Sequence, residues 1–180
     1  MWKVLEKFNF GSSFISAIKC MYNDISSTIR NRGWLSDFFP LKKGIRQGCP
    51  ISALLFILTV EIMAVKIRQA QDVEGIKVKT HSNETVDIKI SQVADDTTLF
   101  VSDLTSMENA FKLIQDFCSN SSLNLNVKKC EGLWIGSYVD RQDTPLGISW
   151  PKTPIKSLGI YFYNSSLHHE CELLNWEKKN

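Results

Sequence analysis

Val93-Ala94-Asp95-Asp96 places two adjacent carboxylates between two short runs of strand-forming residues. The run before it, residues 87–91, alternates polar and apolar side chains as a half-buried strand does, and the run after it, residues 97–101, is rich in β-branched and aromatic residues. The pattern predicts a β-hairpin whose turn carries the charges. Such a turn can present oxygen ligands to Mg²⁺, which phosphoryl-transfer sites hold with one or two carboxylates plus substrate phosphates. An ordinary acidic turn looks the same, because Asp is a favoured turn residue.

A second motif precedes a long apolar segment. Gly44-Ile45-Arg46-Gln47-Gly48-Cys49-Pro50 combines two glycines and a proline with polar residues, which predicts a tight loop leading into a helix. The segment from 51 to about 69 is apolar nearly all round through its middle, so we expect a buried helix. Its apolar run is interrupted by Thr59 and Glu61 and is too short to span a bilayer, and the N-terminus does not read as a signal peptide.

The remaining patterns predict an α+β fold, with an antiparallel sheet backed by helices on one face. Apolar residues recur at helical spacing in residues 2–8, 14–22 and 106–118, and a further helix is expected toward Trp176. Strands are expected near 76–80, 132–136 and 155–163. The triplet Asn31-Arg32-Gly33 predicts the basic tip of another hairpin, between residues 26 and 41.

Composition excludes several classes of protein. The chain has 180 residues, of which 43% are hydrophobic and 22% charged, as in one ordinary globular domain. Its formal charge of +2 is too small to indicate nucleic-acid binding by itself, so binding would depend on local clusters that can equally be solvated surface. Five scattered cysteines predict neither disulfides nor a zinc site, which favours a reducing compartment. The basic clusters are Arg30 with Arg32, Lys42 with Lys43 and Arg46, and Lys128 with Lys129.

In their order along the chain, these motifs resemble those of reverse transcriptases, most closely the enzymes of LINE-type (non-LTR) retrotransposons. Further matches from about Met1 to about Trp176 are Phe8-Asn9-Phe10-Gly11, Asn126-Val127-Lys128-Lys129-Cys130-Glu131 and Ser157-Leu158-Gly159-Ile160. The resemblance implies a polymerase palm-like antiparallel sheet with helices packed on one face, plus a partial fingers hairpin. Residues 1–50 would be partial fingers and connecting loop, 51–163 the palm core with the Asp-Asp hairpin, and 164–180 the start of the connection to a missing thumb.

The activity that this resemblance implies is that of an RNA-directed DNA polymerase. It would use two Mg²⁺ ions, an RNA template, a DNA primer and dNTPs for template-directed nucleotidyl transfer. Asp95 would be a direct metal ligand and Asp96 its support, both catalytic. Lys129 would lie near the pyrophosphate as a proton donor, although a surface lysine fits the same pattern. The residues expected beside the templating pair and the nucleotide are Arg46, Gln47 and Gly48.

The departures from the family pattern lead to a second interpretation. Val93 stands where an aromatic residue is usual, and the family's other metal-binding aspartate lies on a strand before the segment that matches Met1 to Phe10. We therefore expect a fragment that is inactive alone, since that aspartate and the thumb are missing. The alternative is a non-catalytic nucleic-acid-binding or structural remnant of a decayed element. Either would be intracellular, in the nucleus or the cytoplasm, and would not contact a membrane.

Overall fold

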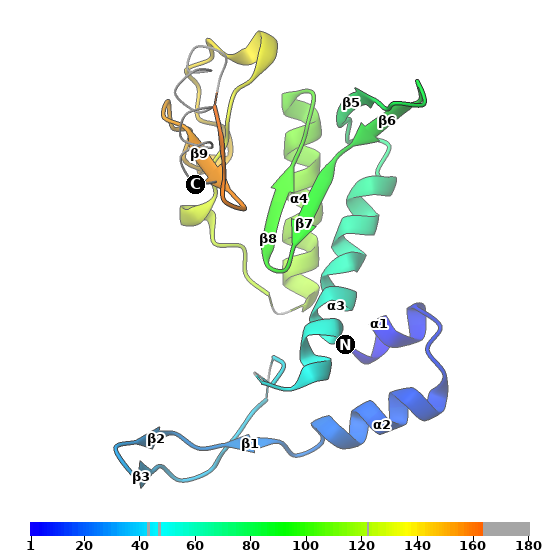
Figure 1. The fold of residues 1–180 in the computed structure, drawn as a ribbon, viewed down its shortest axis with the longest axis vertical. Helices are drawn as coiled ribbons and strands as arrows, with labels where there is room; N and C mark the ends of the chain where they lie inside the picture. Colours follow the sequence, from blue (N-terminus) through cyan, green and yellow to red (C-terminus); the bar gives the residue numbers. More distant parts are fainter. Residues whose placement is uncertain (43, 47, 122, 164–180) are drawn as a thin grey trace. The chain divides into compact units, whose positions relative to one another are not determined.

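The computed structural model describes residues 1–42, 44–46, 48–121 and 123–163. The chain divides into two compact units, Met1–Ala70 and Gln71–Asn180. Each unit is described by itself below, and Figure 1 colours their elements along the sequence. The helix expected toward Trp176 and the start of the thumb connection both lie outside the described residues.

The first unit contains three helices, α1 (Trp2–Lys7), α2 (Ser12–Tyr22) and α3 (Pro50–Gln69). All three confirm the predicted helices, but the burial expected for most sides of α3 is wrong, since Leu54 and Ile57 of this helix are exposed. α3 begins at a proline, whose fixed φ suits the first helical position. Proline lacks a backbone N–H, but the N–H groups of the first turn have no partner within a helix, so nothing is lost there. Lys66 and Arg68 lie in its last turn, where cations interact favourably with the helix dipole, and Arg68 pairs with Glu61 about two turns earlier on the same face.

The core of the first unit lies where the three helices meet. Leu5, Ile15, Ile18 and Leu55 are buried together, one or two from each helix. A polar contact closes this core, because the Tyr22 hydroxyl lies 2.7 Å from the Ser52 hydroxyl and so joins the end of α2 to the start of α3. Burial of apolar side chains from all three helices therefore holds α1 and α2 against the first half of α3.

A two-stranded arm connects α2 to the loop before α3 (Figure 1). β1 (Ser26–Ser27) pairs with β4 (Phe39–Pro40), and β2 (Arg30–Asn31) pairs with β3 (Trp34–Leu35). Arg32 and Gly33 form the tip with φ of +46° and +91°, the pair of positive values that a type I′ hairpin turn requires. The predicted hairpin with a basic tip is confirmed. The arm also exposes large apolar side chains, namely Ile29, Trp34, Leu35 and Phe38.

α3 is also long and apolar enough to cross a membrane, judged by length and composition only. The core helix of a soluble protein passes the same test, so a single such helix is weak evidence for a membrane span. Leu55, Val60, Met63, Ala64 and Ile67 of this helix are buried in the structure. Within the described residues α3 is the one helix that meets the criterion.

The second unit begins with two hairpins. β5 (Ile76–Lys79) pairs with β6 (Thr85–Ile88), and β7 (Ile90–Val93) pairs with β8 (Asp96–Leu99), both antiparallel. The single strand predicted at 87–91 is therefore wrong. The chain leaves one ladder and enters the next at Lys89, since Asp87 lies opposite Lys77 while Ser91 lies opposite Thr98. An alternating pattern shows that a stretch is extended but does not show where its partner strand changes.

The long helix of the second unit, α4 (Leu104–Ser121), confirms the amphipathic helix predicted for 106–118. Its buried stripe, spaced by three or four residues, consists of Met107, Ala110, Ile114 and Phe117. The helix starts earlier than predicted because Asp103 caps it, accepting a hydrogen bond of 2.8 Å from the backbone N–H of Ser106. It also extends through Ser121, so the first part of the turn predicted for 119–124 is wrong.

Two strand predictions near the end of the described chain are wrong. Residues 132–136 form no ladder; the backbone there makes one isolated parallel bridge, between Glu131 and Ser149. The strand expected at 155–163 is a tight hairpin of β9 (Ile155–Ser157) and β10 (Ile160–Phe162), because Leu158 and Gly159 reverse the chain with φ of +51° and +84°. With four helices and small antiparallel ladders in the described residues, the α+β class is confirmed.

Candidate active site

The hairpin of β7 and β8 carries the two carboxylates at its closed end (Figure 1). Val93 lies opposite Asp96, which leaves Ala94 and Asp95 as a two-residue loop. Asp95 is thus in the loop and Asp96 is the first residue of β8, and both side chains are exposed. The hairpin predicted from the sequence is confirmed, with its charges at the turn.

The register of this hairpin fixes the face on which Asp96 stands. Residues directly opposite in an antiparallel pair share one face, and the face alternates along each strand. Asp96 therefore shares a face with Val93 and Thr98, while Ile90 and Leu99 stand on the other face. The carboxylate is directed away from the more apolar face, and solvent or a ligand can reach it.

The loop itself is strained at Ala94. Its φ is +53°, in the left-handed region that costs an L-residue about 1–2 kcal/mol. Glycine is the usual residue at such a position, so the surrounding hairpin must hold this conformation. Next to the loop-closing pair of Val93 and Asp96, the Gln92 side-chain amide donates a hydrogen bond of 3.0 Å to the Thr97 hydroxyl. The sequence analysis missed this pair. It could have been recognised from two polar residues, Gln92 and Thr97, placed symmetrically before and after the loop.

The predicted nucleotide loop lies in the first unit, just before α3. Arg46 is exposed, and its carbonyl accepts a hydrogen bond of 3.5 Å from the backbone N–H of Cys49. Gly48 has φ of +78°, which explains a glycine there, and a Cβ placed on it would meet nothing within 4 Å. Its backbone is therefore open to a ligand. Gln47, predicted beside them, lies outside the described residues.

Cys49 occupies the N-cap position of α3, without a side-chain capping hydrogen bond, and the sequence analysis did not single it out. The pKa of its thiol is lowered from the ordinary value, chiefly because the backbone N–H of Ile51 donates a hydrogen bond to the sulfur. Desolvation is the second-largest effect on this pKa and raises it, while hydrogen bonds from Ser52 and the positive charge of Arg46 add smaller effects that lower it. The signal was present in the sequence, since a residue before proline at a helix start is a natural capping position.

Lys129 lies in η1 (Val127–Lys129), a short 3-10 turn of the second unit. Its side chain is exposed, and its backbone N–H donates a hydrogen bond of 2.9 Å to the carbonyl of Asn126. In the described part of the chain Lys129 forms no ion pair with Asp95 or Asp96. The structure thus brings Asp95 and Asp96 together and, separately, Arg46 and Gly48.

The two carboxylates fit part of a magnesium site. They are exposed and adjacent at the closed end of an antiparallel ladder, and their oxygens are the ligands that a hard cation prefers. Among the described residues there is no group of three or more His, Cys, Asp or Glu side chains placed to hold a metal. Asp95 and Asp96 can therefore supply two ligands, and substrate phosphates or other groups would supply the rest.

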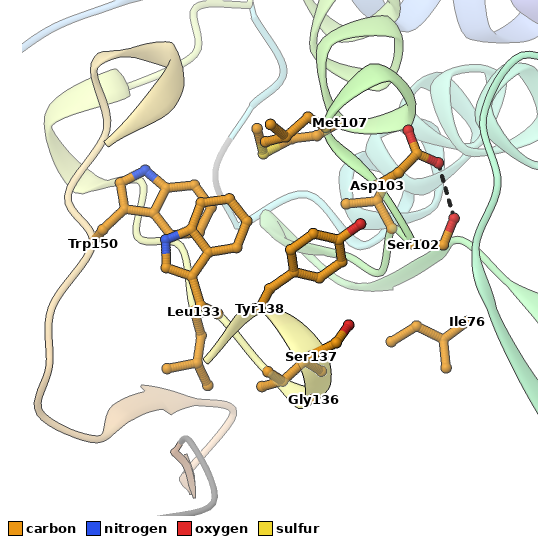
Figure 2. A pocket seen from close by; sticks show the side chains of 13 residues that line it. Ile76, Ser102, Asp103, Met107, Leu133, Gly136, Ser137, Tyr138 and Trp150 are labelled. Atoms are coloured by element: carbon orange, nitrogen blue, oxygen red, sulfur yellow. Dashed lines mark hydrogen bonds between the residues drawn. The ribbon is translucent and has the colours of Figure 1, made fainter. Parts of the chain in front are cut away.

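A pocket of about 270 Å³ in the second unit lies apart from this turn (Figure 2). Asp103 and Tyr138 line it, together with apolar and aromatic residues, but none of the predicted site residues does. The Asp103 carboxylate is already occupied, because it accepts hydrogen bonds from the Ser106 N–H, the Ser106 hydroxyl and the Ser102 hydroxyl. These bonds hold its pKa below the ordinary value.

The aromatic wall of this pocket is also engaged within the protein. The rings of Trp134 and Trp150 stack with centroids 4.0 Å apart. Figure 2 shows Trp150 among the side chains that line the pocket. The guanidinium carbon of Arg141 lies 5.0 Å from the centre of the Trp134 ring, and Arg141 itself forms a bidentate pair with Asp143 at 2.7 Å. Gly132 lies so close to Trp150 that a Cβ would be 2.7 Å from three ring carbons. The stack therefore joins Trp134 to Trp150 across the intervening loop of the second unit.

Comparison with known proteins identifies the protein family to which a chain with this hairpin belongs. The family model described as reverse transcriptase (RNA-dependent DNA polymerase) matches residues 1–162. The transposon TX1 uncharacterized 149 kDa protein of Xenopus laevis is 31% identical over 159 residues, which are 87% of this chain and 12% of that protein. The retrovirus-related Pol polyprotein from type-2 retrotransposable element R2DM of Drosophila melanogaster is 25% identical over 130 residues, 72% of this chain and 12% of that protein.

The chain thus spans 12% of the length of each of these relatives, and what it shares with them is a reverse transcriptase domain segment. The matched residues include the loop before α3 and the acidic hairpin of β7 and β8. The chain belongs to the reverse transcriptase family, of the LINE-type (non-LTR) retrotransposon kind.

Proposed function

We propose that the chain contributes the carboxylate hairpin and the nucleotide loop of an RNA-directed DNA polymerase. The observation that carries this proposal is the position of Asp95 and Asp96 at the exposed end of a two-residue hairpin loop. In the complete enzyme, two Mg²⁺ ions would stabilise the attacking 3′-oxygen of a DNA primer and the leaving pyrophosphate oxygen. The RNA template and the dNTP would be its other partners, in the nucleus or the cytoplasm.

Each proposed residue has a role that its own chemistry supports. Asp95 would bind metal directly, and Asp96 would support it from the same turn. Gly48 leaves its backbone open to the nucleotide and the templating pair, and Arg46 carries an exposed positive charge beside it. Gln47 would lie between them. Lys129 would donate a proton to the pyrophosphate from its exposed position.

The finer architecture is part of the same proposal. We infer a palm-like sheet with helices packed on one face, and a partial fingers hairpin formed by β1 to β4. The functional division at residues 1–50, 51–163 and 164–180 belongs to this proposal too. The antiparallel pairing of β7 with β8 and the burial of the α4 stripe support it, because a palm needs a rigid sheet to carry its carboxylates.

The test uses a longer protein that includes the aspartate-bearing segment before this chain. Asp95→Asn should reduce nucleotidyl transfer by more than the 10–100-fold typical of groups that only orient a metal ligand, and Asp96→Asn should reduce it by about that range. Nucleic-acid binding should change little in both, since phosphate contacts come from basic groups. Asp140→Asn, which removes another exposed carboxylate of the second unit, is the matched control.

Arg46→Ala should have the opposite profile, weakening the binding of nucleotide or template more than it slows the step of transfer. If Asp95→Asn retains turnover equal to that of Asp140→Asn, the hairpin is an acidic turn without a catalytic role. The alternative of a non-catalytic nucleic-acid-binding or structural remnant would then be favoured, and Val93 in place of the usual aromatic residue already points in that direction.

A further inference from the structure

The arm formed by β1 to β4 exposes large apolar side chains, two of them aromatic. Trp34 is 83% exposed and Phe38 is 75% exposed, and Ile29 and Leu35 are each more than half exposed. In the part of the chain that the structure describes, the rings of Trp34 and Phe38 take part in no aromatic or cation–π contact. Large exposed apolar surfaces on folded proteins mark sites of contact with a partner.

Positive charge is concentrated in the same stretch of the chain. Residues 26–46, which comprise the arm and the loop after it, contain five of the 21 basic residues and one of the 19 acidic residues, Asp37. Because the whole chain has a formal charge of +2, this stretch carries +4 and the remainder −2. Arg30, Arg32 and Lys42 are exposed, and no ion pair within the described residues includes them. The charge of the arm therefore complements a partner with several negative charges.

The register of the arm distributes both kinds of side chain over its two faces. Asn31 lies opposite Trp34, and Arg30 lies opposite Leu35, so these neighbouring pairs stand on opposite faces of the ladder. Arg32 is at the tip. Each face thus combines a large apolar side chain with a polar or basic one, and the tip of the arm is positively charged.

This arrangement favours single-stranded nucleic acid over other partners. A second copy of the chain would bring the same positive charge to the contact, and like charges oppose association. A bilayer suits an apolar tip, whereas a charge such as that of Arg32 is costly to bury in lipid. An acidic protein segment supplies negative charges without a regular series of planar rings. Each nucleotide of a single strand supplies both a phosphate and an unpaired base, and unpaired bases stack on aromatic side chains.

We propose that the arm is a binding surface for single-stranded nucleic acid, with bases stacked on Trp34 and Phe38 and phosphates paired with Arg30 and Arg32. The inference goes beyond the proposed polymerase function, because neither the carboxylates of the second unit nor a metal ion takes part. RNA and DNA strands offer the arm the same phosphates and planar rings, so the test includes both.

The experiment measures, by fluorescence anisotropy in the presence of EDTA, the binding of a labelled unstructured RNA of about twelve nucleotides to the full 180-residue chain. The DNA strand of the same sequence should bind comparably, and the corresponding RNA duplex much more weakly. Trp34→Ala should raise the dissociation constant about fivefold to a hundredfold, as the loss of one stacked base typically does. Trp34→Phe keeps an aromatic ring and should recover most of the affinity.

Matched variants separate stacking from general apolar contact and from general charge. Ile29→Ala removes another exposed apolar side chain of the arm that has no ring, so it should leave the affinity nearly unchanged. The double variant Arg30→Gln, Arg32→Gln should reduce the slope of log affinity against log salt by about 1.4, since each phosphate contact with a single strand contributes about 0.7. Lys3→Gln, Lys7→Gln removes two exposed charges of α1 and should leave the slope unchanged.

Four results would overturn the proposal. They are wild-type affinity in Trp34→Ala, an equal loss in Ile29→Ala, the same salt slope in the arginine and lysine double variants, and equal affinity for the duplex. Binding to vesicles of phosphatidylserine and phosphatidylcholine that depends on Trp34, without RNA binding, would assign the arm to a membrane surface instead. Displacement of the RNA by polyglutamate at equal charge would assign it to an acidic protein.

Failure of the polymerase function has a different signature. Asp95→Asn and Asp96→Asn lie in the second unit and should bind the RNA as the wild type does. If the longer protein keeps its turnover in Asp95→Asn while the arm variants lose RNA binding as expected, the catalytic assignment is wrong and the role of the arm stands. If turnover depends on Asp95 while Trp34→Ala binds RNA like the wild type, the catalytic assignment stands and the role of the arm is wrong.

Discussion

The hydroxyl oxygens of Thr98 and Ser157 lie 3.3 Å apart, and this contact joins β8 to β9. Thr98 stands on the same face of its hairpin as Asp96. The β9–β10 hairpin therefore lies beside the face that carries this carboxylate, although the two hairpins share no backbone ladder in the described residues. A partly buried side-chain contact thus links two segments that are far apart in the sequence.

Removal of this contact should destabilise the second unit modestly. Thr98→Val and Ser157→Ala should each lower the free energy of unfolding by about 0.5–1.5 kcal/mol, the net contribution of a typical hydrogen bond. The double variant should lose little more than either single variant, because the same interaction is removed once. Urea denaturation of all four proteins measures the coupling, and strictly additive losses would mean that the two hydroxyls do not interact.

The cap of α4 gives stability that depends on pH. The pKa of Asp103 is lowered in the folded chain, chiefly because the backbone N–H of Ser106 donates a hydrogen bond to its carboxylate. A lowered pKa means that this stabilisation is fully present above the ordinary value of 3.8 and is lost as pH falls through the folded value. Asp103→Asn should therefore be destabilised relative to wild type at pH 7, and the difference should shrink below about pH 4.

Thermal unfolding at several pH values measures this difference. Asp143→Asn is a poor control because Asp143 pairs with Arg141, whereas Asp140→Asn removes an exposed carboxylate and should show no such trend. A difference between Asp103→Asn and wild type that stays constant from pH 7 to pH 3 would show that the charge on Asp103 does not stabilise the fold.

Two glycines of the second unit should not tolerate alanine. A Cβ on Gly75 would overlap the carbonyl of Ile88, and one on Gly132 would press against the Trp150 ring. Gly75→Ala and Gly132→Ala should each cost about 1–3 kcal/mol, as overpacking typically does. Gly11→Ala is the control for steric overlap, because a Cβ there meets nothing within 4 Å, and it should lose only the N-cap preference of α2 for glycine over alanine. Equal melting temperatures for the three variants would contradict these close contacts.

The 180-residue chain by itself should not extend a DNA primer on an RNA template with Mg²⁺ or Mn²⁺. Two metal ions need more carboxylates than one hairpin supplies, and the described residues hold no third acidic, His or Cys group beside Asp95 and Asp96. The assay compares incorporation with that of the double variant Asp95→Ala, Asp96→Ala. Incorporation above this control would show that the chain completes its own metal site.

The sequence alone determined the elements whose physics is local. Apolar residues at helical spacing predicted α2 and α4, and a long apolar run after a proline predicted α3. The Arg32-Gly33 tip followed from turn chemistry. The acidic hairpin could also be predicted from local sequence, since a polar dipeptide between two extended segments is typical of a hairpin turn. The family followed from the order of such motifs, and the match over residues 1–162 confirmed it.

Only the tertiary structure decided which extended segments pair and where each ladder ends. Residues 87–91 and 155–163 each look like one strand, yet Lys89 divides two ladders and Leu158 reverses the chain, because pairing depends on partners distant in sequence. The Gln92–Thr97 bond and the Trp134–Trp150 stack have the same origin. Side-chain contacts across strands and loops require three-dimensional proximity, which hydrophobic periodicity along one segment does not encode.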